Sequence, residues 1–397
     1  MSRPAGRGHV AGLLAPYAEG FRAELLGQGY THGSAAHQIH LIAHLSRWLE
    51  AQGLEPAALD ERVASQFAAA RRADGYAAQL SSRAVVPLLG YLRALGVAPP
   101  RVPEPEAPGD RLIGRFAGYL ARERCLAAES IRGYTGVARR FLAEVDVEGL
   151  TGADVTGFAR RECGRRGVAS AKATVTGLRA LLRFLYLDGQ ITTPLAGAVP
   201  SAACWQLAAL PQSVSPADLA RIVDSCDRRD VAGRRDYAII VLLARLGLRA
   251  GEVAGLELGD IDWRQGEITI RGKGSRRDCL PLPADVGEAV AGWLAEGRPR
   301  NAVGPAVFVR LRPPYGRLAP TSVSCVVRRA CARAGIAAAG AHRLRHTAAA
   351  GMLAAGGTLA EIGQVLRHAR PGTTAVYAKA DLLALSPLAR PWPGGPR

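Results

Sequence analysis

Apolar residues recur at helical spacing through the first half of the chain, in two stretches that match each other. FRAEL (21–25) and FAGYL (116–120) each open a stretch, and LLGYLRALG (88–96) and LLRFLYLDG (181–189) each close one. Between these marks both stretches alternate polar turns with amphipathic helices. The pattern predicts two bundles of about four helices each. It also favours a duplication, although shared helical periodicity alone could produce such matches.

Proline-rich and glycine-rich stretches divide the chain. GVAPPRVPEPEAPGD (96–110) carries five prolines and predicts a linker, and TTPLAGAVPSAACW (192–205) marks a second break. A helix start follows, with Ser215 as N-cap, Pro216 in the first turn and Asp218 at the positive end of the helix dipole. The predicted organisation is an N-terminal helical domain with its linker (1–105), a second helical domain (106–205), a third domain (206–390) and a tail (391–397).

The third domain has a different pattern. DYAIIVLLARLGLRAGEVAGL (236–256) predicts a strongly apolar helix, a break at glycine and a second short helix. GDIDWRQGEITIRGKGSRRDCLPLP (259–283) alternates as strands, with turns at Gly266 and at GKGS (272–275). Further helices are predicted near 284–296, within 320–336, after 340, and around 358–367 and 374–384. The predicted fold class is therefore mainly α, with one small antiparallel sheet in the third domain.

The stretch AHRLRHTAAAG (341–351) concentrates basic groups within little more than one helical turn. His342 and Arg345 are three positions apart, so they share a helix face. A partly buried basic pair needs an anion opposite it. Because no Asp or Glu lies between Glu296 and Glu361, we expect that anion to come from outside this stretch, and a phosphate group fits.

Composition indicates the same kind of partner. With 51 Lys+Arg against 34 Asp+Glu the net charge is +17, which favours a polyanion such as nucleic acid. A membrane surface is the competing interpretation, and an arginine-rich proteome is a third. No run approaches the ~18 apolar residues of a spanning helix, and the first apolar segment is too short for a secretory signal. Seven scattered cysteines without CxxC spacing favour a reducing cytoplasm and no zinc site.

Three N-terminal histidines offer an alternative chemistry. His37, His40 and His44 share one helical face and could in principle hold a metal ion. No cysteine lies nearby and Arg47 adjoins them. We therefore favour a polar face that is solvated or turned towards DNA, and expect no metal.

Six polar residues of the third domain form a recognisable series: Arg249 in GLRAGEV, Lys273 in RGKGS, His342 and Arg345 in HRLR, His368 in LRHA and Tyr377 in TTAVYAKAD. The series resembles that of the tyrosine recombinase and phage integrase family, over residues 206–384. The second domain resembles the core-binding, SAM-like domain of that family, and the first is interpreted as its duplicate. The resemblance implies a multi-domain clamp around double-stranded DNA.

The family chemistry gives each residue of the series an expected role. Tyr377 attacks the scissile phosphate, leaving a 3′-phosphotyrosyl bond and a free 5′-OH. Arg249 and Arg345 hold the non-bridging oxygens, and Lys273 protonates the leaving oxygen. His342 acts as general base and His368 donates a hydrogen bond to the phosphate. The resemblance implies that neither a metal nor ATP is required.

The sequence departs from the family pattern at two positions. Arg367 stands where glycine usually precedes the histidine, and Leu246 stands where threonine is common. Arg367 either contacts phosphate or is solvated, and the residues leave both open. Glu252 is interpreted as a partner that holds a helix turn near Arg249. His346 either is structural, the interpretation we favour, or supports His342.

The resemblance predicts a site-specific recombinase or integrase of a mobile element, working through a Holliday junction at the bacterial nucleoid. Dimers on each site and tetramers in the synapse are expected, with accessory proteins left open. Two alternatives are a catalytically silent DNA-binding protein and a type IB topoisomerase. The complete series of six residues favours an active enzyme, and the helical second domain together with the short C-terminal segment favours a recombinase over a topoisomerase. The sequence names neither the DNA site nor the choice between integration, transposition and dimer resolution.

Overall fold

The computed structural model describes residues 10–101, 108–165, 167–201, 213–272, 276–368 and 371–380. Contacts between residues divide the chain into two units. One unit combines Met1–Pro100 with Ala209–Arg397, and the other is Arg101–Ala208. Each described segment buries a hydrophobic core of its own: one in 10–98, one in 112–199 and one in 214–344, with a small fourth cluster in 349–377. Within the described ranges, no helix combines the length and the apolar character needed to cross a membrane.

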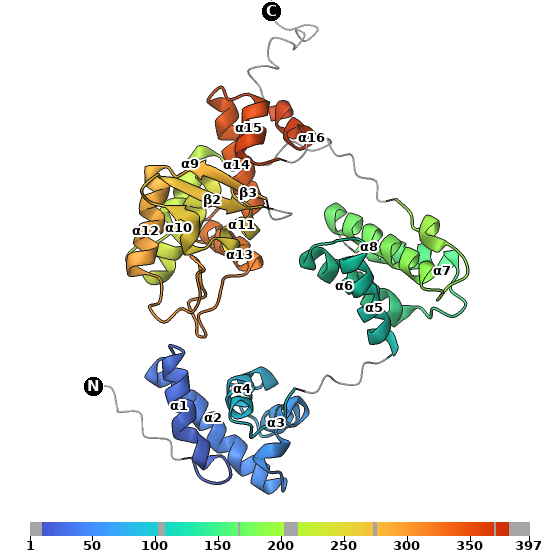
Figure 1. Cartoon of the computed structure of the whole chain (residues 1–397), viewed down its shortest axis with the longest axis vertical. Helices are drawn as coiled ribbons and strands as arrows, with labels where there is room; N and C mark the ends of the chain where they lie inside the picture. The colour runs from blue at the N-terminus through green and yellow to red at the C-terminus, as the bar shows by residue number, and fades with distance from the viewer. Residues whose placement is uncertain are drawn as a thin grey trace, which may run out of the picture. The chain divides into compact units, whose positions relative to one another are not determined.

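The N-terminal segment is a four-helix arrangement: α1 (Ala15–Gly27), α2 (His32–Ala51), α3 (Glu61–Ala73) and α4 (Val86–Ala94), as Figure 1 shows. Side-chain caps begin two of these helices, because Thr31 accepts a hydrogen bond from Ser34 N and Asp60 accepts one from Val63 N. Phe21, from the FRAEL stretch, is fully buried. Among the three histidines of α2, His44 lies 3.1 Å from the Tyr76 hydroxyl, while His37 and His40 are exposed.

The described part of the second unit also contains four α-helices: α5 (Pro108–Arg122), α6 (Ala128–Glu144), α7 (Gly152–Gly164) and α8 (Val168–Leu187). FAGYL lies in α5 and LLRFLYLDG at the end of α8, just as their counterparts lie in α1 and α4. Two bundles of about four helices are therefore found, while the duplication stays a prediction. One boundary is corrected: α5 begins at Pro108, inside the predicted linker, because proline is well tolerated in a first turn. Residues 102–107 lie outside the described ranges.

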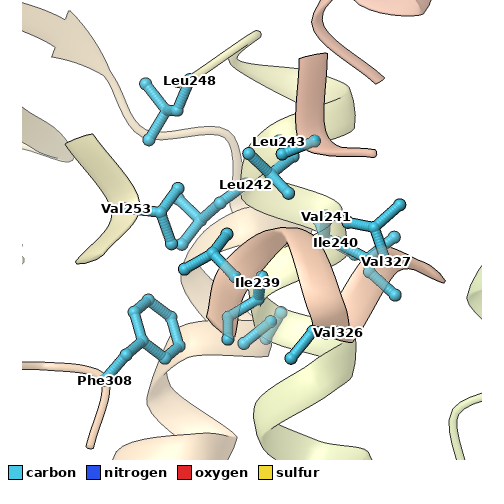
Figure 2. Close-up of a cluster of buried hydrophobic side chains, with 14 of the residues drawn as sticks. Ile239, Ile240, Val241, Leu242, Leu243, Leu248, Val253, Phe308, Val326 and Val327 are labelled. Atoms are coloured by element: carbon cyan, nitrogen blue, oxygen red, sulfur yellow. The ribbon is translucent and has the colours of Figure 1, made fainter. Parts of the chain in front are cut away.

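The third segment contains the predicted helices and sheet. Its helices up to residue 333 are α9 (Pro216–Asp224), α10 (Val231–Arg245), α11 (Ala250–Gly255), α12 (Ala284–Glu296) and α13 (Pro320–Arg333). The predicted start of α9 is confirmed, since Ser215 Oγ accepts a hydrogen bond from Asp218 N. Helix α10 is the centre of the core and packs against α12, α13 and α14 (Ala341–Ala354). Figure 2 shows its Ile239, Leu242 and Leu243 among Val326, Val327 and Phe308 of neighbouring elements.

The sheet is antiparallel, in the order β1 (Ile261–Asp262), β2 (Glu267–Arg271) and β3 (Arg277–Pro281). Gly266, in the turn between β1 and β2, has φ +66°, a conformation that glycine adopts without strain. Strands β2 and β3 pair from Glu267 opposite Pro281 to Arg271 opposite Arg277. Of the predicted second turn, GKGS (272–275), Gly272 donates through its N–H to Arg276 O at 2.8 Å, while residues 273–275 lie outside the described ranges.

The last described elements are α14, α15 (Leu359–Val365), α16 (Pro371–Thr374) and a 3₁₀ segment, η5 (Ala375–Ala380). The helix predicted around 374–384 is wrong in its described part, because residues 375–380 form a 3₁₀ segment. Such short 3₁₀ pieces are common at the ends of α-helices. Ala349 of α14, Ile362 and Leu366 from the region of α15, and Tyr377 of η5 form the small fourth cluster. This packing places the predicted nucleophile against the helix that carries His342.

Candidate active site

Arg249 lies at the turn between α10 and α11, where Glu252 fixes it. Glu252 Oε2 accepts a hydrogen bond from Arg249 N at 2.8 Å, and Oε1 accepts one from Arg249 Nη1 at 2.6 Å. The Glu252 side chain is 5% exposed and that of Arg249 is 45% exposed. The interpretation of Glu252 as the residue that holds this helix turn is confirmed. Arg249 keeps one open side towards solvent, where a phosphate can approach.

Arg345 is the buried arginine of the site, 2% exposed on α14. Its Nη1 donates to Gly247 O at 2.5 Å and its Nη2 donates to Leu366 O. Gly247 has φ +58°, and a Cβ there would lie 2.5 Å from Leu366 Cδ2, so the turn requires glycine. Burial, together with the charge of Arg249, lowers the pKa of Arg345 to about 10. The guanidinium is thus held rigidly in a position where an anion would stabilise its charge.

Arg367 lies in the turn after α15, with φ +55°. It is buried, and its Nη2 lies 2.8 Å from Glu252 Oε2. The solvated interpretation of Arg367 is therefore wrong. The anion that this side chain contacts in the structure is Glu252, because the turn directs it inwards beneath Arg249.

Tyr377 is 2% exposed, and its hydroxyl is hydrogen-bonded to His346, with Oη 2.9 Å from Nδ1. His342 packs edge-to-face on His346, with ring centroids 4.4 Å apart. Sequence reasoning favoured a structural role for His346, whereas the structure puts this side chain in direct contact with the predicted nucleophile. The available signal was its position four residues after His342, on the same helix face.

Burial controls the protonation of these rings. Burial raises the pKa of Tyr377, while the Arg345 charge opposes that rise. Burial and the His342 ring lower the pKa of His346 to about 4. Loss of hydration and the charges of Arg345 and Arg249 also lower the pKa of His342. At neutral pH the hydrogen bond therefore joins a phenol to a neutral imidazole.

His368 follows α15 and stacks near Tyr377, with ring centroids 6.5 Å apart. Its Nδ1 lies 2.7 Å from Thr374 Oγ1, which fixes the ring orientation. Burial, then Arg345 and Arg249, lowers the pKa of His368 to about 4. An anionic phosphate would offset the part of this lowering that comes from the arginine charges.

The structure brings together five of the six predicted site residues: Arg249, His342, Arg345, His368 and Tyr377. The sixth, Lys273, lies outside the described residues, between the ends of β2 and β3. Glu252 forms ion pairs with Arg249 and Arg367, and its charge also acts on Arg345. One carboxylate thus faces three guanidinium groups, so the cluster carries excess positive charge. Such a site is suited to bind one phosphate group beside a tyrosine hydroxyl.

Comparison with known proteins agrees with this geometry. The model of the phage integrase family matches residues 212–382. The protein named "Putative integrase/recombinase y4rA", from Sinorhizobium fredii, is 38% identical over 406 residues, covering 99% of this chain and 97% of its own. Tyrosine recombinase XerC of Shewanella amazonensis is 30% identical, covering 69% of this chain and 93% of its own.

Solved structures share the fold. The XerH site-specific recombinase bound to a palindromic difH substrate, in a post-cleavage complex, matches 72% of this chain and 97% of its own, with TM-score 0.55 and 19% identity. A lambda integrase tetramer bound to a Holliday junction matches 73% of this chain and 85% of its own, with TM-score 0.52 and 15% identity.

A mainly helical DNA-clamp fold with clustered arginines, histidines and a tyrosine defines the tyrosine recombinases, enzymes that cleave and rejoin DNA strands. The chain belongs to the phage integrase family of these recombinases.

Proposed function

We propose that this recombinase acts at specific DNA sites of a mobile element and that Tyr377 is its nucleophile. One observation carries the assignment: the Tyr377 ring is packed in the small apolar cluster with Ala349 and Leu366, and its hydroxyl is hydrogen-bonded to His346 within the influence of the Arg345 charge. The hydroxyl is thus fixed beside a neutral proton acceptor, and it lies close enough to Arg345 for that charge to oppose the effect of burial on the tyrosine pKa.

The proposed reaction exchanges one phosphodiester for another. The Tyr377 oxygen forms a bond to phosphorus while the bond to the 5′ oxygen breaks, which leaves a 3′-phosphotyrosyl adduct and a 5′-OH. Attack of a 5′-OH from another strand reverses the step and releases tyrosine. Because the number of phosphoester bonds is unchanged, no energy-supplying cofactor is needed.

The remaining roles follow the charges around that phosphate. Arg249 and Arg345 neutralise the non-bridging oxygens of the pentacoordinate transition state. Lys273 supplies the proton to the leaving oxygen, and the hairpin of β2 and β3 that flanks it supports this role. His368 donates a hydrogen bond to a non-bridging oxygen. His342 is the proposed acceptor of the tyrosine proton, and it would receive that proton by way of His346, which lies between the two.

Assembly on DNA is proposed from the family. The neighbouring lambda integrase structure is a tetramer on a Holliday junction. We propose the same progression here, from a dimer on one site to a tetramer on paired sites, in the cytoplasm. The extra N-terminal bundle would enlarge the contacted DNA. This enlargement, with the named integrase/recombinase relative, favours integration or transposition of a mobile element.

A nicked DNA substrate tests the proposal. Sites are first located by footprinting DNA that flanks the gene. A nick just 3′ of the scissile phosphate then lets the short fragment that carries the new 5′-OH diffuse away, so that the adduct accumulates. Wild-type protein should form the adduct at full rate in excess EDTA, because arginines and lysine supply the positive charge. Loss of the adduct on chelation, restored by Mg²⁺, would contradict the mechanism.

A further inference from the structure

We propose that Arg367 is a positioning residue for the phosphate clamp, holding Glu252 so that Glu252 orients Arg249 without occupying its phosphate-binding side. The inference rests on the proposed role of Arg249 in binding the scissile phosphate. It concerns the position where the family usually has glycine, and where this chain carries the largest cationic side chain instead.

Glu252 is shared between two arginines. Its Oε2 accepts from Arg249 N at 2.8 Å and from Arg367 Nη2 at 2.8 Å, while its Oε1 accepts from Arg249 Nη1 at 2.6 Å. Only one carboxylate oxygen is thus used by the Arg249 side chain. Without Arg367, Oε2 would keep only the Arg249 backbone N–H, and its remaining acceptor position could bind the Arg249 guanidinium together with Oε1 in a two-pronged pair. That pair would compete directly with the incoming phosphate.

The backbone of the same turn contacts both proposed clamp residues. Arg367 O accepts from Arg249 Nη2 at 3.5 Å, and Leu366 O accepts from Arg345 Nη2. A shift of this turn would therefore move both guanidiniums. The Arg367 side chain secures the turn at two points, through Glu252 on α11 and through Val365 O, to which its Nη1 donates at 2.9 Å.

The strained backbone conformation of Arg367 indicates that contacts of its side chain compensate for the strain. Its φ of +55° disfavours any residue with a Cβ, and glycine would relieve the strain. The Arg367 side chain is also only 3% exposed, and its Nε has no hydrogen-bond partner among the described residues. A strained and partly unsatisfied arginine is retained only where its remaining contacts compensate, and the strongest of these is Glu252.

Charge supports the same arrangement. Burial would raise the pKa of Glu252, but the Arg249 backbone N–H and the Arg367 charge outweigh burial and keep the pKa low. Glu252 therefore stays ionised beneath the clamp. Arg367 offsets that negative charge, so the carboxylate does not cancel the attraction of Arg249 for phosphate.

The matched pair Arg367→Lys and Arg367→Gln tests the inference in the full-length protein. Both variants have a Cβ and so keep the same backbone strain; lysine keeps the positive charge, whereas glutamine replaces it with a neutral and shorter amide. Single-turnover adduct formation is measured at saturating protein, on a nicked substrate with a normal scissile phosphate and on one with a methylphosphonate, which lacks the non-bridging charge. Arg249→Ala serves as the reference.

On normal phosphate we expect Arg367→Gln to slow the adduct about tenfold or more, at nearly unchanged DNA affinity, since misplaced groups reduce the rate of the chemical step. Arg367→Lys should stay within about threefold of wild type, because an ammonium can still pair with Glu252 even though it gives up the contact with Val365 O. On methylphosphonate the difference in rate between Arg367→Gln and wild type should nearly vanish, because this substrate lacks the negative charge that a correctly placed Arg249 stabilises. A merely structural role would slow both substrates alike.

Three outcomes would overturn the inference: Arg367→Gln at wild-type rate, equal slowing of the Lys and Gln variants, or equal slowing on both substrates. Arg249→Ala separates this inference from the proposed function. If Arg249→Ala itself cleaves normal phosphate at wild-type rate, the clamp assignment fails and not only the role of Arg367. If Arg249→Ala is slow while Arg367→Gln is normal, only the role of Arg367 fails.

Discussion

The substitution Arg345→Lys keeps the positive charge of the proposed phosphate clamp, formed by Arg249 and Arg345, but removes the forked N–H donors of the guanidinium. The guanidinium reaches Gly247 O with one nitrogen and Leu366 O with another, and a single ammonium cannot reach both and a phosphate together. At least one buried carbonyl would lose its donor, which costs about 1–3 kcal/mol of folding free energy. For a domain of this size each kcal/mol lowers Tm by roughly 2–4 °C, so Tm should fall by about 2–12 °C.

The effect on the reaction should be larger than the effect on stability. Loss of one pre-organised donor to the transition state typically lowers the rate by about 10²–10³. The assay is single-turnover adduct formation on nicked DNA at a temperature well below both melting transitions. Arg229→Lys is the matched control, since Arg229 is exposed and pairs with Asp227 on the surface. Wild-type adduct formation by Arg345→Lys would refute the proposed clamp, because charge alone would then suffice.

Three further predictions concern other parts of the molecule. His346→Phe keeps the ring but removes the acceptor for the Tyr377 hydroxyl, so the adduct should form about tenfold more slowly in single-turnover assays; an unchanged rate would make the hydrogen bond irrelevant to catalysis. In the DNA-free folded protein the pKa values of His346 and His368 are lowered to about 4, so the unfolded chain binds protons at a higher pH than the folded chain does, and the free energy of unfolding should fall as the pH is lowered from 6.5 to 4. The melting temperature of His346→Phe should therefore depend less on pH over this range than that of the wild type. An equal dependence would contradict the lowered pKa of His346. Residues 10–98 bury a hydrophobic core of their own, so deletion of residues 1–100 should leave adduct formation intact but shrink the protected footprint; identical protection would assign the N-terminal bundle to protein contacts.

Much of the fold was predictable because its signals are local. The Ser215 cap, the apolar run of α10 and the alternation of β2 and β3 each depend on neighbouring residues and keep their form in the structure. The predicted α-helix around 374–384 was wrong in its described part. The sequence there has helical periodicity, but the α-helix that begins at Pro371 ends at Thr374 and a 3₁₀ segment follows it.

The proposed site was predictable where residue type and order carry the chemistry, as for Arg249, His342 and Tyr377. Contacts between distant segments were not predictable. The pairing of Arg367 with Glu252 spans 115 positions, and the contact of His346 with Tyr377 spans 31. Both depend on how α11, α14 and the turn after α15 pack together, which no local pattern specifies. For Arg367 the sequence left phosphate contact and solvation both open, because exposed arginines are the rule and no local pattern indicates burial against Glu252.

The identity of the nucleophile is the central claim, and a covalent adduct tests it most directly. Wild-type protein and Tyr377→Phe are incubated with the same nicked substrate, digested with nuclease and protease, and analysed by mass spectrometry. The account predicts a nucleotide remnant on Tyr377 in the wild type and no covalent complex for Tyr377→Phe, which should still bind DNA. A remnant on any other residue, or an adduct formed at wild-type level by Tyr377→Phe, would contradict it.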